Sequence, residues 1–183
     1  MSLNKTLLTL SFAAAGLMTF SSVQAATNAQ VTITGQIAAA TCDLSVTKSN
    51  VDLGTYVSAD ITANDVIAGS SKDFTLNLTN CSAAYDSTDE DAVPVSLYAT
   101  GTALAANNNY FNNIDGGTVG VKLTADSGAV EVKPNVAAEI GSLTALTAGG
   151  SATIPMTAAL FSTVATPSSQ VIEAPITFSV AYN

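Results

Sequence analysis

Histidine, arginine and tryptophan are absent from this chain of 183 residues, and lysine occurs only five times. Without histidine the usual general base of enzymes is missing, and neither a Ser-His-Asp triad nor a Cys-His pair can form. The sequence also shows no glycine-rich phosphate loop between a strand and a helix. We therefore expect a protein that is not an enzyme and that requires no cofactor.

The shortage of basic residues excludes a second class of function. Fourteen acidic residues against five lysines give a formal net charge of −9. Nucleic-acid binding requires a positively charged surface, and anionic membrane surfaces attract basic segments. We expect no nucleic-acid partner and no stable membrane insertion.

The N-terminal residues have the pattern of a secretory signal peptide. Lys5 precedes a short apolar run at 6–20, and small residues follow at Val23 and Ala25. The run is short for a membrane span, and the small residues predict cleavage after Ala25. The alternative is an N-terminal membrane anchor. Cleavage would leave about 158 residues with a net charge of −10, because Lys5 is lost, and that length fits one domain with a sizeable core.

Cysteine occurs only at Cys42 and Cys81. Two cysteines in an exported chain predict a disulfide, because compartments outside the cytoplasm are oxidising. The bond would close a loop of about 40 residues, which corresponds to roughly 4 kcal/mol from chain entropy alone. Metal ligation and a reactive thiol are the alternatives. Two cysteines without histidine make a poor metal site, so we predict no metal centre.

Apolar and polar side chains alternate along much of the chain. This period of two predicts half-buried strands in an antiparallel sandwich or barrel. The segments are 72–81, 93–99, 118–125, 151–160 and 174–183. One window, 136–143, has a weak helical pattern, but it is short and contains Gly141, so it predicts at most a turn of helix or irregular structure.

The stretch AAYDSTDEDA (83–92) is acidic and has no apolar periodicity. It predicts an exposed loop. A calcium site is the sharper alternative, but the glycine and final glutamate of an EF-hand loop are missing.

A well-formed strand pattern lies near the start of the expected mature chain, where most proteins fray. In QVTITGQIAAATC (30–42), Val31, Ile33 and Ile37 share one face, Gly35 lies between them, and Cys42 ends the stretch. This strand lacks an obvious partner in the sequence.

The order of these motifs resembles the chaperone–usher fimbrial subunits of the type 1-like pilin family. QVTITGQIAAATC is followed about forty residues later by FTLNLTNC, and the chain ends in ITFSVAYN. The stretches GTVGVKLTADSG and IPMTAALFSTVATP are also similar to later strands of that family. The resemblance covers the whole mature chain and implies an all-β fold, an incomplete immunoglobulin-like (pilin) sandwich with an N-terminal donor-strand extension.

The resemblance implies three segments and a function. These are a signal peptide (1–25), a donor-strand extension (26–39) and a pilin domain (40–183). The implied protein is a structural subunit of the pilus shaft, polymerised by donor-strand exchange and supporting adhesion. Its implied partners are neighbouring fimbrial subunits, a periplasmic chaperone and an outer-membrane usher. Its implied route leads through the periplasm to a fimbrium on the cell surface.

The family pattern also assigns site residues. Val31, Ile33, Gly35 and Ile37 would form the donor strand, and Ile176, Phe178, Val180 and Tyr182 would line the acceptor groove and contact the chaperone. The alternatives are that 30–37 is the first strand of its own domain and that 174–183 is an ordinary core strand. The chain departs from the family in one place: a glycine about fourteen residues from the end is replaced by the region of Ser168, Ser169 and Gln170.

A different function remains open at this point. A pilin-like subunit could bind a host receptor with its own surface, through the acidic loop 83–92 or the asparagine-rich segment NNNYFNN (107–113). Such a protein would be an adhesin rather than a shaft subunit.

Overall fold

The computed structural model describes residues 42–182, apart from 83, 87, 90–94, 114, 142 and 144. All of them belong to one compact unit that spans residues 37–183. The predicted signal peptide and donor strand lie outside the described residues. None of the helices in the described part of the chain is long and apolar enough to cross a membrane.

The described residues form strands and two short 3-10 helices. The strands are β1 (Asp43–Val46), β2 (Asp65–Val66), β3 (Lys72–Thr79), β4 (Tyr85–Asp86), β5 (Val95–Thr100), β6 (Ala103–Leu104), β7 (Asn107–Phe111), β8 (Val119–Ala125), β9 (Val130–Val132), β10 (Ala137–Glu139), β11 (Ala145–Leu146), β12 (Ala152–Ser162) and β13 (Thr177–Tyr182). The 3-10 helices are η1 (Ser58–Asp60) and η2 (Asp126–Gly128). The predicted all-β class is confirmed.

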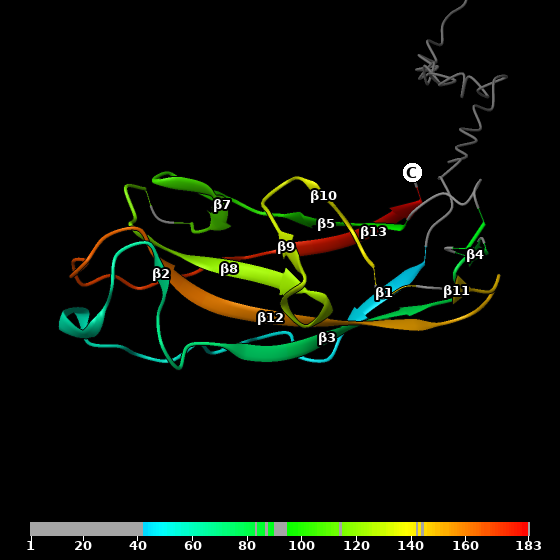
Figure 1. Ribbon diagram of the computed structural model, residues 1–183, viewed down its shortest axis with the longest axis horizontal. Helices are drawn as coiled ribbons and strands as arrows, with labels where there is room; N and C mark the ends of the chain where they lie inside the picture. The colour runs from blue at the N-terminus through cyan, green and yellow to red at the C-terminus, as the bar shows by residue number, and fades with distance from the viewer. Residues whose placement is uncertain are drawn as a thin grey trace, which may run out of the picture. The chain divides into compact units, whose positions relative to one another are not determined.

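Two sheets form the layers of a sandwich. The larger has the strand order β1-β3-β12-β8-β7-β6, with β2 paired to β12 and β9 paired to β8. The smaller has the order β10-β5-β13, and β11 pairs with β4 in a separate two-stranded sheet. Figure 1 shows β5 and β13 in one layer and β3 and β12 in the other. Every ladder between two strands of the described residues is antiparallel.

The predicted alternation places one face of each long strand in the core. In β3, Phe74, Leu76 and Leu78 are buried, and the side chains between them are half-buried. They pack with buried residues of β5 and β12, which include Val95, Leu97, Ile154 and Met156. Each such side chain contributes about 1.5–3 kcal/mol to folding relative to remaining exposed. The five alternating segments predicted from the sequence contain β3, β5, β8, β12 and β13, and the last of these strands begins at Thr177 rather than at Ala174.

The prediction of at most a turn of helix or irregular structure for 136–143 is wrong for 137–139. Residues Ala137–Glu139 form strand β10, in which Ala138 lies opposite Leu97 of β5. Ala138 and Ile140 are buried, so this short segment also has a period of two. Alanine and glutamate have little intrinsic preference for strands, and pairing with β5 overrides that preference.

The acidic stretch 83–92 is only partly described. Tyr85 and Asp86 form β4, which pairs with β11, and Asp86, Thr88 and Asp89 are exposed. The backbone N–H and hydroxyl of Thr88 both donate to Oδ1 of Asp86, at 2.9 and 2.7 Å. These hydrogen bonds, the backbone one first, lower the pKa of the Asp86 carboxyl. No group of three or more potential metal ligands gathers among the residues that the structure describes.

The predicted disulfide between Cys42 and Cys81 is confirmed. It joins the residue before β1 to the chain just after β3, across a sequence separation of 39. Cys81 is fully buried, its carbonyl accepts a hydrogen bond from Gly149 N at 2.8 Å, and its N–H donates to Gly150 O. The bond therefore ties the start of the described chain to the end of β3, the neighbour of β1 in the larger sheet.

Replacing both cysteines by serine is expected to lower the free energy of unfolding by about 2–4 kcal/mol, because the unfolded chain gains the freedom of an open loop. Urea unfolding of the oxidised protein and of the double variant measures the difference. The control is the wild-type protein under reducing conditions, which should match the variant. Equal midpoints for oxidised wild type and double variant would contradict the prediction.

Candidate functional site

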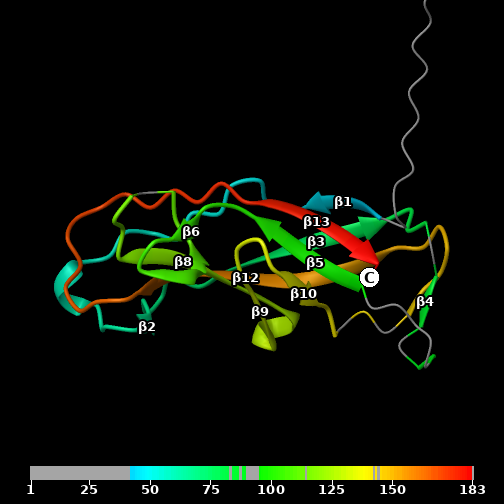
Figure 2. The ribbon, with the colours of Figure 1, turned by 90° about the horizontal axis from the view of Figure 1, so that it is seen from above.

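Strands β1 and β13 each lie at the edge of a sheet. Among the described strands, β1 pairs only with β3 and β13 pairs only with β5. Figure 2 shows β13 beside β5, at the edge of the smaller sheet. An edge strand presents unpaired N–H and C=O groups to any extended segment that can pair with it.

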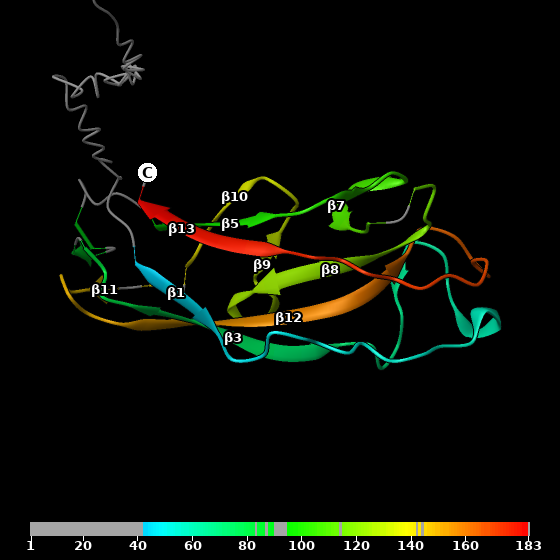
Figure 3. The same cartoon turned by 180° about the vertical axis from the view of Figure 1, so that it is seen from behind.

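Long segments without regular structure continue from both edges. Residues 47–57 follow β1, and residues 163–176 precede β13. In Figure 3, strands β8 and β12 are visible between these two segments. Neither segment forms a strand, so no ladder covers this side of the sandwich, which we call its open side.

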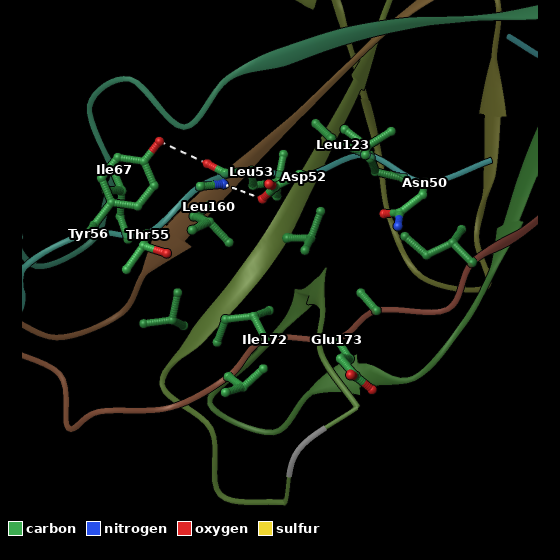
Figure 4. A pocket seen from close by; sticks show the side chains of 18 of the residues that line it. Asn50, Asp52, Leu53, Thr55, Tyr56, Ile67, Leu123, Leu160, Ile172 and Glu173 are labelled. Atoms are coloured by element: carbon green, nitrogen blue, oxygen red, sulfur yellow. Dashed lines mark hydrogen bonds between the residues drawn. The ribbon is translucent and has the colours of Figure 1, made fainter. Parts of the chain in front are cut away.

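A groove of about 1280 Å³ runs along this open side. Figure 4 shows part of it at close range. One wall consists of Val46 and Lys48–Tyr56, and the other of Pro167–Phe178. The floor is formed by side chains from the core: Ile67, Phe74, Val119, Val121, Leu123, Ala158 and Leu160.

The wall that leads into β13 has the alternating side chains of a strand. On the side of the groove, no described strand pairs with it. Ile172, Ala174, Ile176 and Phe178 are half-buried and pack against the core. The residues between them, Glu173, Pro175 and Thr177, are exposed. A row of half-buried apolar side chains beside an unpaired edge is typical of a sheet that lacks one strand.

The opposite wall shows the same partial burial. Val51, Leu53 and Tyr56 are half-buried and pack against the core cluster. Local hydrogen bonds hold this wall: Gly54 N donates to Oδ1 of Asp52 at 2.9 Å, and the Tyr56 hydroxyl donates to Leu53 O at 2.8 Å (Figure 4). Gly54 has a φ of +94°, a conformation that other residues rarely adopt.

Aromatic packing connects a wall to the floor. The rings of Phe178 in β13 and Phe74 in β3 lie 6.0 Å apart, tilted by 49°. Phe74 is 7% exposed, whereas Phe178 is only half-buried. A strand laid into the groove would cover the remaining surface of Phe178 and complete this contact.

Two contacts link the chain around β1 to the chain around β13. At one end the Ser58 hydroxyl donates to Pro167 O, which links the two walls directly. At the other end the Tyr182 hydroxyl lies 3.7 Å from Sγ of Cys42. Burial raises the pKa of Tyr182 above its ordinary value. Ser58 and Pro167 line the groove, whereas Cys42 and Tyr182 lie beyond its lining, which ends at Val46 and Phe178.

Charged side chains are few along this surface. Of the described residues that line the groove, Lys48, Asp52 and Glu173 carry charge. The remainder are apolar or neutral polar side chains. The lining of the groove is therefore mainly apolar and carries little charge.

Gly101, the residue after β5, lies close to the wall of the groove that contains Pro175. A Cβ at this residue would lie 3.0 Å from Pro175 O and 3.0 Å from the Phe111 ring. Asn135 brackets the same glycine, because its Nδ2 donates to Gly101 O at 3.0 Å and its Oδ1 accepts from Gly101 N at 3.3 Å. Pro175 can approach the sheet only because residue 101 has no side chain.

Gly101→Ala is expected to push the 172–176 wall outward and to lower the free energy of unfolding by about 1–3 kcal/mol through overpacking. Thermal or urea unfolding measures the effect. Gly141→Ala is the matched control, because its Cβ would meet only Asp126 Oδ2, at 3.6 Å. Equal stability of the two variants would show that the wall does not depend on Gly101.

The predicted groove residues have three different environments. Ile176 and Phe178 line the groove, whereas Val180 is buried in the core and Tyr182 is half-buried beside Cys42. A role in contacting a partner remains a prediction for all four. The donor-strand residues Val31, Ile33, Gly35 and Ile37 lie outside the described residues.

The sequence prediction missed two parts of the groove. One is the wall opposite β13, and the other is the start of the wall that leads into β13. Val51 and Leu53 alternate with polar neighbours, but the pattern is too short to predict a strand. Ile172 extends the alternation of 174–183 toward the N-terminus by one step. These short patterns can be interpreted only in the structure, where the two wall segments lie on either side of the same groove floor.

The segment NNNYFNN (107–113), one of the two contact regions of the receptor-binding alternative, offers little aromatic surface. Tyr110 and Phe111 are buried, and Tyr110 stacks on Phe161 with 4.2 Å between ring centroids. Nδ2 of Asn112 donates to Val119 O. These side chains stabilise β7 against β8 and β12, and nothing in their geometry favours a receptor site.

Comparisons with known proteins agree with this architecture. A family model described as "Fimbrial protein" matches residues 31–183. The crystal structure of the P pilus rod subunit PapA superposes with a TM-score of 0.56 at 18% identity, covering 79% of this chain and all of that chain. A structure of a chaperone–usher pilus, which addresses rod uncoiling, gives a TM-score of 0.55 at 18% identity, covering 85% of this chain and 96% of the other. The comparison with curated proteins finds no match.

Proposed function

Because this chain belongs to the fimbrial protein family, we propose that it is a structural subunit of a pilus shaft that polymerises by donor-strand exchange. The groove between residues 46–58 and 167–178 would accept a strand from the next copy. The observation that carries this proposal is the pair of unpaired edges, β1 and β13, with half-buried apolar side chains between them.

The donor is residues 31–37 of a neighbouring copy. The side chains of Val31, Ile33 and Ile37 would enter the groove. Gly35 would lie at a position where a larger side chain would clash with the groove. Burial of three aliphatic side chains contributes about 1.5–3 kcal/mol each, and hydrogen bonds along β13 add to this. The extension 26–39 contains no charged residue, which suits a mainly apolar groove whose charged lining residues are Lys48, Asp52 and Glu173.

The other parts of the assembly follow from the same proposal. Residues 1–25 direct export, 26–39 form the donor extension, and 40–183 form the domain that receives a strand. A periplasmic chaperone would cover the groove before assembly, because a free edge and exposed apolar surface promote aggregation. An outer-membrane usher would be the place of exchange, and the fibre would project from the cell surface.

A peptide competition experiment tests the proposal. A synthetic peptide of residues 27–37 is incubated with the purified chaperone–subunit complex, and the release of chaperone is followed by size-exclusion chromatography. The peptide is expected to displace the chaperone and to form a stable complex with the subunit. The same peptide with Ile33→Asp is the control and should not, because a carboxylate would enter an apolar site. Equal behaviour of both peptides would overturn the proposal.

A further inference from the structure

A glutamine lies at one end of the mainly apolar groove. Gln170 lines the groove and is half-buried. Its Nε2 donates a hydrogen bond to Ser168 O at 3.2 Å and another to Thr118 Oγ1 at 3.4 Å. Because a carbonyl oxygen only accepts hydrogen bonds, the contact with Ser168 O determines which end of the Gln170 amide is the nitrogen.

The oxygen of the same amide has no partner. Oε1 of Gln170 is buried, and no donor among the described residues forms a hydrogen bond with it. A buried acceptor in this state is unfavourable, because its hydration is lost without a replacement. Both hydrogen bonds of Nε2 are long for N–H···O contacts, so they hold the amide weakly. An N–H group that enters this end of the groove would therefore meet an acceptor that can turn toward it.

The direction of an added strand follows from the sheets. Every ladder between two described strands is antiparallel, so a strand added to β13 is expected to be antiparallel as well. Strand β13 runs from Thr177 to Tyr182, away from Gln170. The C-terminal end of the donor strand, at Ile37, would therefore lie toward Gln170 of the subunit that receives it.

The groove positions of the wall and of the donor have the same number and spacing. The half-buried apolar residues of the wall are Ile172, Ala174, Ile176 and Phe178. The donor residues assigned to the groove are Val31, Ile33, Gly35 and Ile37. Directly opposite residues of an antiparallel pair have their side chains on the same face. The antiparallel pairing that aligns both sets places Ile33 opposite Ile176 and Ile37 opposite Ile172.

This register places Gln170 opposite Ala39. Ala39 is the next residue of the donor face after Ile37, and residues 38–40 are all alanine. A large side chain at position 39 would meet the side chain of Gln170, whereas alanine leaves room for it. The main-chain N–H groups of residues 38–41 would lie at the end of the groove where Oε1 of Gln170 lacks a donor.

From this match we infer that Gln170 sets the register of the donor strand, because it accepts a main-chain N–H of residues 38–41 and accommodates only a small side chain at position 39. The inference rests on the proposed donor-strand assembly and gives one residue of the groove a positioning role in it. A strand shifted by two residues keeps its apolar face toward the groove, but it places Ile37 or Thr41 opposite Gln170. The apolar floor discriminates weakly between such shifts, and Gln170 disfavours them.

Peptides of two lengths test the acceptor role. Peptides 27–41 and 27–37 are titrated against chaperone–subunit complexes of the wild type and of Gln170→Met, which has a side chain of similar length without the amide. Size-exclusion chromatography gives the peptide concentration that releases half of the chaperone. With the wild type, the longer peptide is expected to act at about three- to tenfold lower concentration. With Gln170→Met this gain should disappear, and a gain retained in full would overturn the acceptor role.

A larger side chain at position 39 gives the second readout. Ala39→Leu in peptide 27–41 is expected to raise the half-release concentration at least about tenfold with the wild type, because the leucine overpacks against Gln170. Gln170→Ala should restore release to within about threefold of the unmodified peptide. Ala40→Leu is the matched control, because it places the same side chain on the opposite face of the strand. It should act like the unmodified peptide with both subunits.

The outcomes separate this inference from the donor-strand proposal. If peptide 27–37 displaces the chaperone while neither the Gln170 variants nor Ala39→Leu change the release, the positioning role of Gln170 is overturned and the assembly proposal stands. If neither peptide displaces the chaperone from the wild-type subunit, the donor-strand proposal is overturned and this inference with it.

Discussion

Deletion of residues 27–37 is expected to abolish fibres while leaving the subunit folded in complex with its chaperone. The described domain begins at Cys42, and its core is formed by β3, β5, β8, β12 and their neighbours. The deleted residues would serve the groove of another copy, so the domain itself would lose none of these contacts. The measurements are the yield of soluble chaperone–subunit complex and the number of surface fibres seen by electron microscopy.

Gly35→Phe is the narrower version of the same experiment. A bulky side chain would clash where the donor backbone approaches the groove floor, so complex formation should persist and fibres should be lost or shortened. If 30–37 were instead the first strand of its own domain, deletion would remove several kcal/mol of burial from a fold of marginal stability. Loss of the chaperone complex, or fibres of normal length, would contradict the account.

Phe178→Asp is expected to prevent capture by the chaperone and to leave little subunit in the periplasm. Phe178 lines the groove and packs on Phe74 at 6.0 Å. Loss of a fully buried aromatic side chain costs about 3–5 kcal/mol, so the loss at the half-buried Phe178 is smaller, and a carboxylate covered by a partner strand adds the cost of desolvation. Tyr182→Asp should act in the same direction, because Tyr182 packs against the core cluster at the end of β13. Steady-state subunit level, measured by immunoblot, is the readout.

Ser179→Asp is the matched control for Phe178→Asp. Ser179 is the next residue of β13 and is exposed on the other face, so a carboxylate there remains in water. Normal levels of Ser179→Asp with loss of Phe178→Asp would support a groove wall. Normal levels of both would show that the wall of β13 has no part in recognition.

The sequence predicts the long strands well because their burial is local in origin. In β3 and β12, apolar side chains at every second position fit one buried face, and no other regular structure satisfies that pattern. The disulfide is predictable for a similar reason, since Cys42 and Cys81 are the only two thiols of the chain. Strand β10 is not predictable in this way, because Ala137–Glu139 acquires its conformation from pairing with β5.

The groove is only half predictable from the sequence. The alternation of Ile176 and Phe178 predicts an apolar face, but it cannot show that the face lacks a covering strand. That property arises from long-range placement: residues 48–56 and 167–178 are more than 100 residues apart, and only the fold brings them to either side of one floor. The resemblance to pilins supplies the expectation of a missing strand, and the unpaired edges of β1 and β13 give it a location.

The most direct test of donor exchange is a crosslink between subunits of different isotopic label. Ile33 and Ile176 are both replaced by cysteine in ¹⁴N-labelled and ¹⁵N-labelled chains, fibres are assembled from an equal mixture, and the disulfide-linked peptides are identified by mass spectrometry. The account predicts peptides that join position 33 to position 176, with mixed-label pairs as frequent as same-label pairs. Links between these positions found exclusively within one label would show that residues 30–37 fill the groove of their own chain, and would contradict donor-strand exchange.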